Sequence, residues 1–164
     1  MQENIKTSAR LATQEDVPAL LTLWEEFMRA VPDADPDAAR CYWTERLRVQ
    51  IEKSQVVIAE SNGTPVGFAG FIDSSQRGWI PESVAYVVDI YVVPEARAFH
   101  AAKLLFEHLL YSAAQGYTEV WTNTSVQNRH VQILLTRVGF TPLEDFEIPG
   151  LNEQLYYRRR REIA

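Results

Sequence analysis

The chain has 164 residues, a length that suits one domain with a sizeable core. Its hydrophobic content of 46% and charged content of 23% are ordinary for a soluble globular protein. The net charge of −6 argues against a general nucleic-acid binder, because such proteins bind by neutralising phosphates. No apolar run is long enough to span a bilayer, so no membrane partner is expected.

The first residues and the cysteine count bear on the compartment. Met1–Lys6 lacks the apolar core of a signal peptide, and the single cysteine, Cys41, cannot form an internal disulfide. Both features predict a cytoplasmic location. The basic run Arg158–Arg161 departs from the acidic composition, and it indicates a guarded sheet edge, a solvated tail, or a patch for a phosphate or a partner.

A short strand and two helices are predicted first. Residues 8–12 form the strand, and Thr13 can cap a helix whose apolar residues recur at helical spacing. A second helix, residues 38–53, should turn four residues inward: Tyr42, Trp43, Leu47 and Ile51. The acidic turn between the helices, residues 32–37, is either a solvated loop or an entrance that attracts an amine.

A hairpin is predicted next. Residues 55–60 form one strand, Asn62-Gly63 is a strong turn signal, and residues 65–72 form the returning strand. The two glycines of the second strand either weaken it or let another backbone come close. The polar residues 73–81 then form a loop.

A strand, a short connection and a helix occupy residues 86–115. The strand is residues 86–93, Pro94 ends it, and the helix follows the connection 95–99 and stops at Gln115-Gly116. Such a unit can be an ordinary part of an α/β domain. It can also bind an anion, because the first turn of a helix presents free N–H groups and the positive end of the dipole.

The remaining elements complete the fold prediction. Residues 119–124 form a strand, a helix opens at Ser125 or Asn128, and residues 146–148 and 154–160 form a last hairpin around Pro149-Gly150. This order predicts one α/β (α+β) domain spanning residues 1–164. Its mixed, mostly antiparallel sheet of about seven strands should be flanked by helices on both faces.

Four strings in this order resemble the GNAT N-acetyltransferase superfamily, and the resemblance covers nearly the whole chain. They are residues 12–20 at the first helix, residues 62–68 at the hairpin, residues 92–97 after the central strand, and Asn128 with Leu134, Gly139 and Phe140. Each string is weak alone, but the four in the right order favour the fold strongly.

The resemblance implies that acetyl-CoA binds as a cosubstrate, without a metal. In the family the pantetheine arm lies between the fourth and fifth strands, and the matching backbone is Ile90, Tyr91 and Val92. The pyrophosphate lies on the following loop, which matches Arg97, Ala98, Phe99, His100, Ala101, Ala102 and Lys103. Asn128 matches a polar residue that contacts the cofactor arm.

Two positions depart from the family pattern. His100 stands where the loop has a glycine, which lets the backbone approach phosphate without a Cβ. An imidazolium there would favour pyrophosphate, whereas the bulk of the ring would narrow the site. Leu135 stands where many members have the tyrosine that reprotonates the thiolate, and the nearby alternatives are Tyr91, Tyr117 and His130.

The implied reaction is direct attack of a primary amine, carried by a small molecule, on the thioester. A base must take a proton from the amine, and a backbone N–H of Tyr91 or Val92 would stabilise the developing oxyanion. Asp89 and Glu82 are the candidate bases on or near the fourth strand. Asp89 has the alternative role of a structural carboxylate satisfied by backbone groups.

Two other classes compete with this enzyme. His100 and Leu135 favour a catalytically impaired relative that binds CoA or another ligand as a sensor or an interaction module. A purely structural domain would use the Arg158–Arg161 strand as a dimer edge. Dimerisation is common in the family, so a homodimer is one expected assembly.

Overall fold

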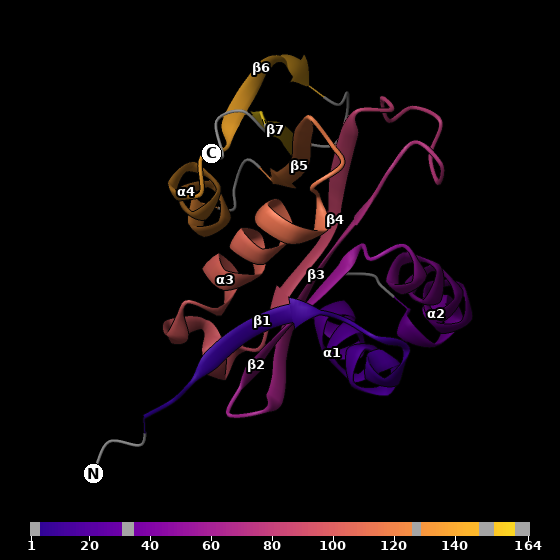
Figure 1. The fold of residues 1–164 in the computed structure, drawn as a ribbon, viewed down its shortest axis with the longest axis vertical. Coiled ribbons are helices and arrows are strands. Elements are labelled where there is room, and N and C mark those ends of the chain that lie inside the picture. Colours follow the sequence, from indigo (N-terminus) through magenta and orange to yellow (C-terminus); the bar gives the residue numbers. More distant parts are fainter. Residues whose placement is uncertain (1–3, 31–34, 126–128, 148–152, 160–164) are drawn as a thin grey trace.

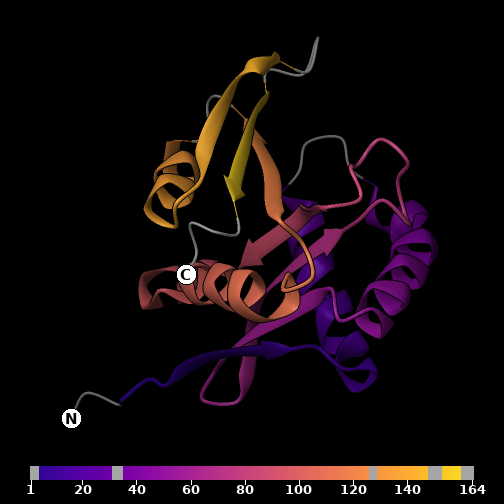
Figure 2. The ribbon, with the colours of Figure 1, turned by 45° about the horizontal axis from the view of Figure 1, so that its top comes forward.

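A computed structural model describes residues 4–30, 35–125, 129–147 and 153–159. One sheet runs through it in the order β1-β2-β3-β4-β5-β7-β6 (Figures 1 and 2). The strands are β1 (Thr7–Leu11), β2 (Val56–Ser61), β3 (Thr64–Ile72), β4 (Val84–Val92), β5 (Glu119–Ser125), β6 (Thr141–Glu147) and β7 (Glu153–Arg159). All neighbours are antiparallel except β4 and β5. The predicted mixed, mostly antiparallel sheet is therefore confirmed.

Helices cover both faces of this sheet (Figure 1). One face carries α1 (Val17–Arg29), which follows a 3-10 turn η1 (Gln14–Asp16), and α2 (Pro36–Glu52). The other face carries α3 (Ala101–His108) and α4 (Arg129–Arg137). A 3-10 helix η2 (Pro94–Phe99) leads into α3, and a π-helical turn η3 (Leu109–Ala113) extends it. None of the helices in the described ranges is long and apolar enough to cross a membrane.

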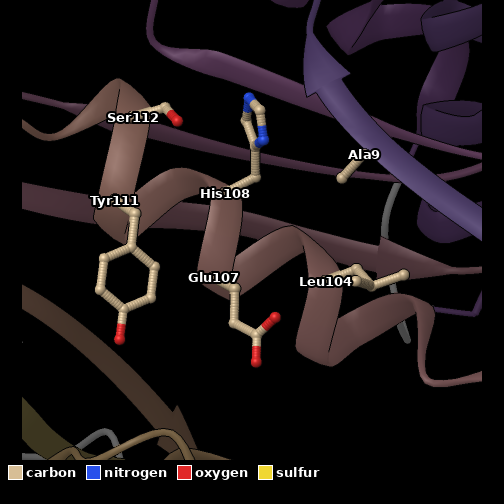
Figure 3. A pocket seen from close by; sticks show the side chains of 6 residues that line it. All are labelled: Ala9, Leu104, Glu107, His108, Tyr111 and Ser112. Carbon is tan, nitrogen blue, oxygen red and sulfur yellow. The ribbon is translucent and has the colours of Figure 1, made fainter.

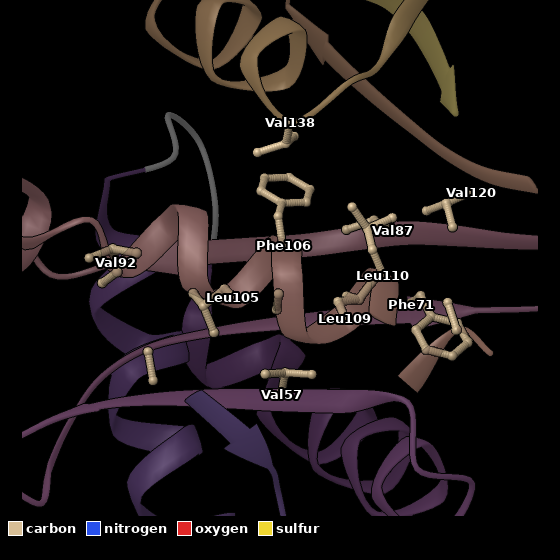
Figure 4. Close-up of a cluster of buried hydrophobic side chains, with 14 of the residues drawn as sticks. Val57, Phe71, Val87, Val92, Leu105, Phe106, Leu109, Leu110, Val120 and Val138 are labelled. Atoms are coloured by element: carbon tan, nitrogen blue, oxygen red, sulfur yellow. The ribbon is translucent and has the colours of Figure 1, made fainter. Parts of the chain in front are cut away.

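The α3 side of the sheet holds the larger core (Figure 4). Helix α3 and the turn after it bury Leu105, Phe106, Leu109 and Leu110 against β2, β3, β4 and β5. The ring of Phe106 also meets the ring of Phe140 edge-on, with centroids 5.7 Å apart. This burial fixes α3 against the sheet and so fixes its first turn beside the end of β4.

Stacked aromatic rings join α1 and α2 on the opposite face. The rings of Trp24 and Trp43 stack with centroids 4.7 Å apart, and Trp43 meets Phe68 of β3 edge-on at 6.0 Å. Trp43, Leu47 and Ile51 are buried as predicted. Tyr42 is 61% exposed, so its predicted inward position is wrong. It lies one residue, about 100° of helix turn, away from the buried stripe.

The hairpin between β2 and β3 confirms its turn signal. Asn62 and Gly63 have φ values of +50° and +80°, which a two-residue hairpin of this kind requires. Gly67 of β3 confirms the expected close approach, since a Cβ built there would lie 2.6 Å from the carbonyl oxygen of Tyr91. The absence of a side chain at Gly67 therefore lets β3 lie tightly against the end of β4.

Some predicted boundaries move and some predictions fall outside the described residues. β6 begins at Thr141, five residues before the strand predicted at Phe146. The predicted continuous helix after residue 100 becomes α3 followed by a π-helical turn. Residues 32–34 of the acidic turn, the turn at Pro149-Gly150, and Arg160 and Arg161 lie outside the described residues.

Candidate functional site

β4 loses its neighbour β5 halfway along its length. Residues Val84–Val87 pair with Glu119–Thr122, after which β5 continues to Ser125 beside β7. The β3–β4 ladder shifts register at Gly70/Phe71 and leaves Val88 as the extra residue of a β-bulge. From Val88 onward, β4 therefore has an edge that no described strand pairs with.

The register shows which peptide groups lie on this free edge. The N–H of Val93 donates to the carbonyl oxygen of Val66 at 2.8 Å, within the ladder to β3. Because antiparallel partners alternate, the peptide groups of Tyr91 also face β3, and those of Ile90 and Val92 face the free edge. Of the two expected N–H donors, Val92 is thus on the free edge and Tyr91 is not.

The first turn of α3 follows directly. The N–H of Leu104 donates to the carbonyl oxygen of His100 at 3.1 Å, which is the first hydrogen bond of the helix. The N–H groups of Ala101–Lys103 come before it and therefore have no acceptor within the helix. His100 has φ +59° and ψ 20°, a left-handed conformation that glycine adopts without strain. The exposed Arg97 donates from Nε to the carbonyl oxygen of Val92 at 3.0 Å. That bond ties the free edge to the loop before α3.

Not every predicted contact residue can be placed in the site. Asn128 lies outside the described residues. Ala98 and Phe99 contribute the end of η2 through their backbone, and their side chains are likewise outside the description.

Asp89 lies next to the bulge, one residue before Ile90. Its carboxylate receives a hydrogen bond from Nη2 of Arg46 in α2 at 2.5 Å, and the side chains are 14% and 25% exposed respectively. Burial raises the pKa of the Asp89 carboxyl, and the guanidinium of Arg46 opposes that rise without cancelling it. The described partner of the Asp89 carboxylate is therefore the side chain of Arg46. The alternative role, a structural carboxylate, predicts backbone groups as partners instead.

Glu82 is exposed in the turn before β4. It precedes Asp89 by seven residues, about 23 Å along an extended strand. The structure does not bring the two carboxylates together. Within the described ranges, no group of three or more His, Cys, Asp or Glu side chains could hold a metal ion.

The candidate proton donors lie apart from one another. Leu135, at the position where many family members have the tyrosine, is buried in the core beside α3. Of the alternative donors, His130 is exposed at the start of α4. The hydroxyl of Tyr91 donates to Oε2 of Glu26 at 3.5 Å on the α1 side of the sheet. Burial, with a smaller effect from Glu26, raises the pKa of Tyr91, so its hydroxyl keeps its proton.

Tyr117 instead holds the loop between β3 and β4. Its hydroxyl donates to Asp73, whose carboxylate also receives the side-chain amide of Gln55 at 3.2 Å. The carbonyl oxygen of Asp73 accepts the N–H groups of Gln76 and Arg77 at 3.0 and 3.2 Å. This cluster fixes the start of the loop that carries Arg77.

The Tyr117 hydroxyl gives a prediction about alkaline stability. Burial, reinforced by Asp73, raises the pKa of Tyr117 to about 12 from 10.0. Because the folded pKa exceeds the unfolded one, the stabilisation is complete below pH 10 and is lost as pH rises towards about 12. The drop in unfolding free energy between pH 9 and about pH 11.5, from urea titrations, should be smaller in Tyr117→Phe than in the wild type. An equal drop in both proteins would contradict the assignment, and Tyr111→Phe, an exposed ring, is the control.

Among the described residues, cavities open on both sides of the sheet. One of about 290 Å³ lies between α2 and the β3–β4 loop, and we call it the α2 cavity. Its walls are Tyr42, Glu45, Arg46, Val49, Ile72, Gln76 and Arg77. Through Arg46, this cavity adjoins Asp89.

The second cavity, of about 240 Å³, lies on the outer side of α3 beside β1 (Figure 3). It is lined by Ala9, Leu104, Glu107, His108, Tyr111 and Ser112. In Figure 3, Glu107 and Tyr111 project from the helix on the side away from His108. None of its walls belongs to β4 or to the loop before α3.

A family model supports the arrangement of these elements. The model for the acetyltransferase (GNAT) family matches residues 18–140, which include β4, the loop after it and α3. A search of curated proteins by sequence finds no match.

Solved structures match nearly the whole fold. The PaiA N-acetyltransferase from Thermoplasma acidophilum in complex with coenzyme A is 18% identical, with a TM-score of 0.71 over 94% of this chain and 99% of that one. YncA from Salmonella typhimurium with acetyl-CoA is 20% identical, with a TM-score of 0.69 over 96% and 95%. Diaminobutyrate acetyltransferase EctA from Paenibacillus lautus, with L-2,4-diaminobutyric acid and coenzyme A, is 18% identical, with a TM-score of 0.70 over 96% of both chains.

Proposed function

Since the chain belongs to the acetyltransferase (GNAT) family, we propose that it transfers the acetyl group of acetyl-CoA to the primary amine of a small molecule. The observation that carries this proposal is the free edge of β4 next to the first turn of α3. The three similar structures named above contain coenzyme A or acetyl-CoA, and one of them contains a small diamino acid.

The residues at the free edge fit an extended, anionic cosubstrate. The peptide groups of Ile90 and Val92 face the free edge of β4, beyond the point where β5 stops pairing with it. An amide-containing chain can form hydrogen bonds with them there, as a neighbouring strand would. The N–H groups of Ala101–Lys103 suit a diphosphate, and so do the guanidinium N–H groups of Arg97 that do not bond Val92. Acetyl-CoA, when bound, supplies the activated acetyl thioester.

Asp89 is the base in this proposal. Its raised pKa makes its carboxylate a better proton acceptor than an ordinary aspartate. It lies beside Ile90 along the strand, and Arg46 connects it to the α2 cavity, from which an amine could approach. Glu82 has no place in this arrangement, because it lies at the other end of β4.

The free N–H groups and the leaving group complete the chemistry. The N–H of Val92 or Ile90 can donate to an oxygen that gains negative charge in the transition state. A thiol with a pKa of about 8.5 leaves as a thiolate without an obligatory acid, which suits the apolar Leu135. A cytoplasmic location and a homodimer stay predictions.

Turnover of acetyl-CoA with a panel of primary amines tests this function. Free thiol should appear in proportion to added amine, and the acetylated product should be found by mass spectrometry. Binding of acetyl-CoA by calorimetry without any turnover would favour the impaired sensor or interaction module. The absence of both binding and turnover would reject the proposal.

His100→Gly gives a second test, specific to the loop. Removing the Cβ should let phosphate approach the amides of the first turn and tighten CoA binding by up to about tenfold. Stability should change by less than about 1 kcal/mol, because relief of left-handed strain is offset by the greater freedom of the unfolded chain. Calorimetry and urea unfolding measure the two effects.

The matched control for this substitution is Ser54→Gly. Ser54 also has a φ of +59°, but it lies at the end of α2, away from the loop. It should leave CoA affinity as in the wild type. Weaker CoA binding by His100→Gly would instead show that the imidazole contributes to phosphate binding.

A further inference from the structure

We propose that the amine acceptor also carries a carboxylate, which Arg77 binds in the α2 cavity. The acceptor is then a small amino acid or a related zwitterion. This inference rests on the proposed function and adds the chemical class of the second substrate.

Arg77 carries a charge that no described carboxylate neutralises. Its Nη2 donates to the hydroxyl of Tyr42 at 2.7 Å, and its Nη1 donates to the carbonyl oxygen of Gln76 at 2.9 Å. Both acceptors are neutral. A guanidinium held in place by neutral groups keeps its attraction for an anion, and its planar array of donors suits a carboxylate.

The position of Arg77 is fixed before any ligand binds. Its backbone N–H is held by the carbonyl oxygen of Asp73, and Asp73 is in turn held by Tyr117 and Gln55. The loop therefore presents the guanidinium without having to order itself, which lowers the entropic cost of binding.

The charges around the cavity match a molecule that bears both signs. Arg46 and Arg77 supply two cations, and Glu45 on the wall and Asp89 beside Arg46 supply two carboxylates. When Asp89 is counted with the wall residues, these charges cancel, and such a site attracts neither a polyanion nor a polycation strongly. A zwitterion can place its carboxylate at Arg77 and its amine towards Asp89, with Arg46 between them.

Size and apolar surface point to the same class. The volume of about 290 Å³ is close to the lower end of the range for small-molecule sites. Tyr42 and Val49 are 61% and 44% exposed, so they offer an apolar wall for an aliphatic chain. The exposed Tyr42 would therefore have two roles: its ring forms part of the cavity wall, and its hydroxyl holds Arg77.

Matched amines with and without a carboxylate test the inference. L-Ornithine is compared with putrescine, and L-lysine with cadaverine, as acceptors for acetyl-CoA. The wild type should favour the amino acid of each pair by about tenfold or more in kcat/KM. In Arg77→Gln this ratio should fall towards one, and Arg77→Lys should keep part of it. Arg48→Gln, an equal charge change on an exposed part of α2, should keep the wild-type ratio.

The outcomes separate this inference from the proposed function. Acetylation of both members of each pair at equal rates, or a ratio unchanged in Arg77→Gln, overturns the carboxylate inference and leaves the acetyltransferase standing. If no amine is acetylated, calorimetry with L-ornithine and with putrescine in the presence of CoA decides the inference alone. Binding of L-ornithine only, lost in Arg77→Gln, supports it, and any other binding result overturns it.

Discussion

Asp89→Asn is expected to lower kcat/KM for the amine by about 10²–10⁴. Asparagine has the same shape and can still accept a hydrogen bond from Arg46, but it cannot take a proton. The loss should therefore appear in turnover, while CoA affinity stays close to that of the wild type. Initial rates at varied amine concentration, with calorimetry for CoA, measure both.

Asp16→Asn is the matched control for this substitution. Asp16 forms an ion pair with Arg10 at 2.8 Å, and its side chain is 13% exposed, nearly the same as that of Asp89. It lies in η1, away from β4. Its replacement should leave kcat/KM unchanged. If Asp89→Asn also keeps more than about a third of the wild-type kcat/KM, Asp89 serves only as the partner of Arg46.

The raised pKa of Asp89 adds a signature in pH. Activity should rise as Asp89 ionises, at a pH above its ordinary value of 3.8. The free energy of unfolding should change in the opposite direction, because the pKa of Asp89 is higher in the folded than in the unfolded protein. The contribution of Asp89 to this free energy is greatest below pH 3.8 and is lost as pH rises through the raised pKa. The difference in unfolding free energy between the wild type and Asp89→Asn should follow this trend. An acidic limb that persists in the variant would show that another group controls the rate.

Local patterns predicted the elements well. Hairpin chemistry at Asn62-Gly63 and helical spacing at Trp43, Leu47 and Ile51 are decided by residues close in the chain, and the structure confirms both. Tyr42 shows the limit of this approach, because the pattern predicts its ring in the core and the structure leaves it exposed beside the buried stripe.

The site depends on contacts that no local pattern contains. Arg46, which neutralises Asp89, lies 43 residues away in the chain and in another helix. The bulge at Val88 lies at the end of the apolar run Val84–Val88, directly before Asp89, so alternation along the sequence does not show which N–H groups face β3. No sequence pattern points to Arg77 either, because its proposed role depends on the lack of an anionic partner among the described residues. Family resemblance indicates where the candidate site lies, and the strand register shows which peptide groups face its free edge.

Ala102→Asp should weaken CoA binding on the order of 100-fold or more while leaving the fold at least as stable. Ala102 is the second residue of α3, it is partly exposed, and the first turn of this helix has no acidic residue. A carboxylate there interacts favourably with the helix dipole, by about 0.3–1 kcal/mol. The same carboxylate repels a diphosphate, since two like charges about 4 Å apart at an effective dielectric constant near 20 cost about 4 kcal/mol before salt screening.

The opposite signs of these two effects make the test specific. Damage to the fold would lower stability and binding together, whereas occupation of an anion site lowers binding alone. Thr22→Asp adds the same charge to an exposed position on α1, across the sheet, and should change CoA affinity little. Calorimetry at two salt concentrations and thermal unfolding supply the measurements. Equal CoA affinity in both variants would place the diphosphate away from α3, and the free edge of β4 would then lack the anchor that the proposed reaction requires.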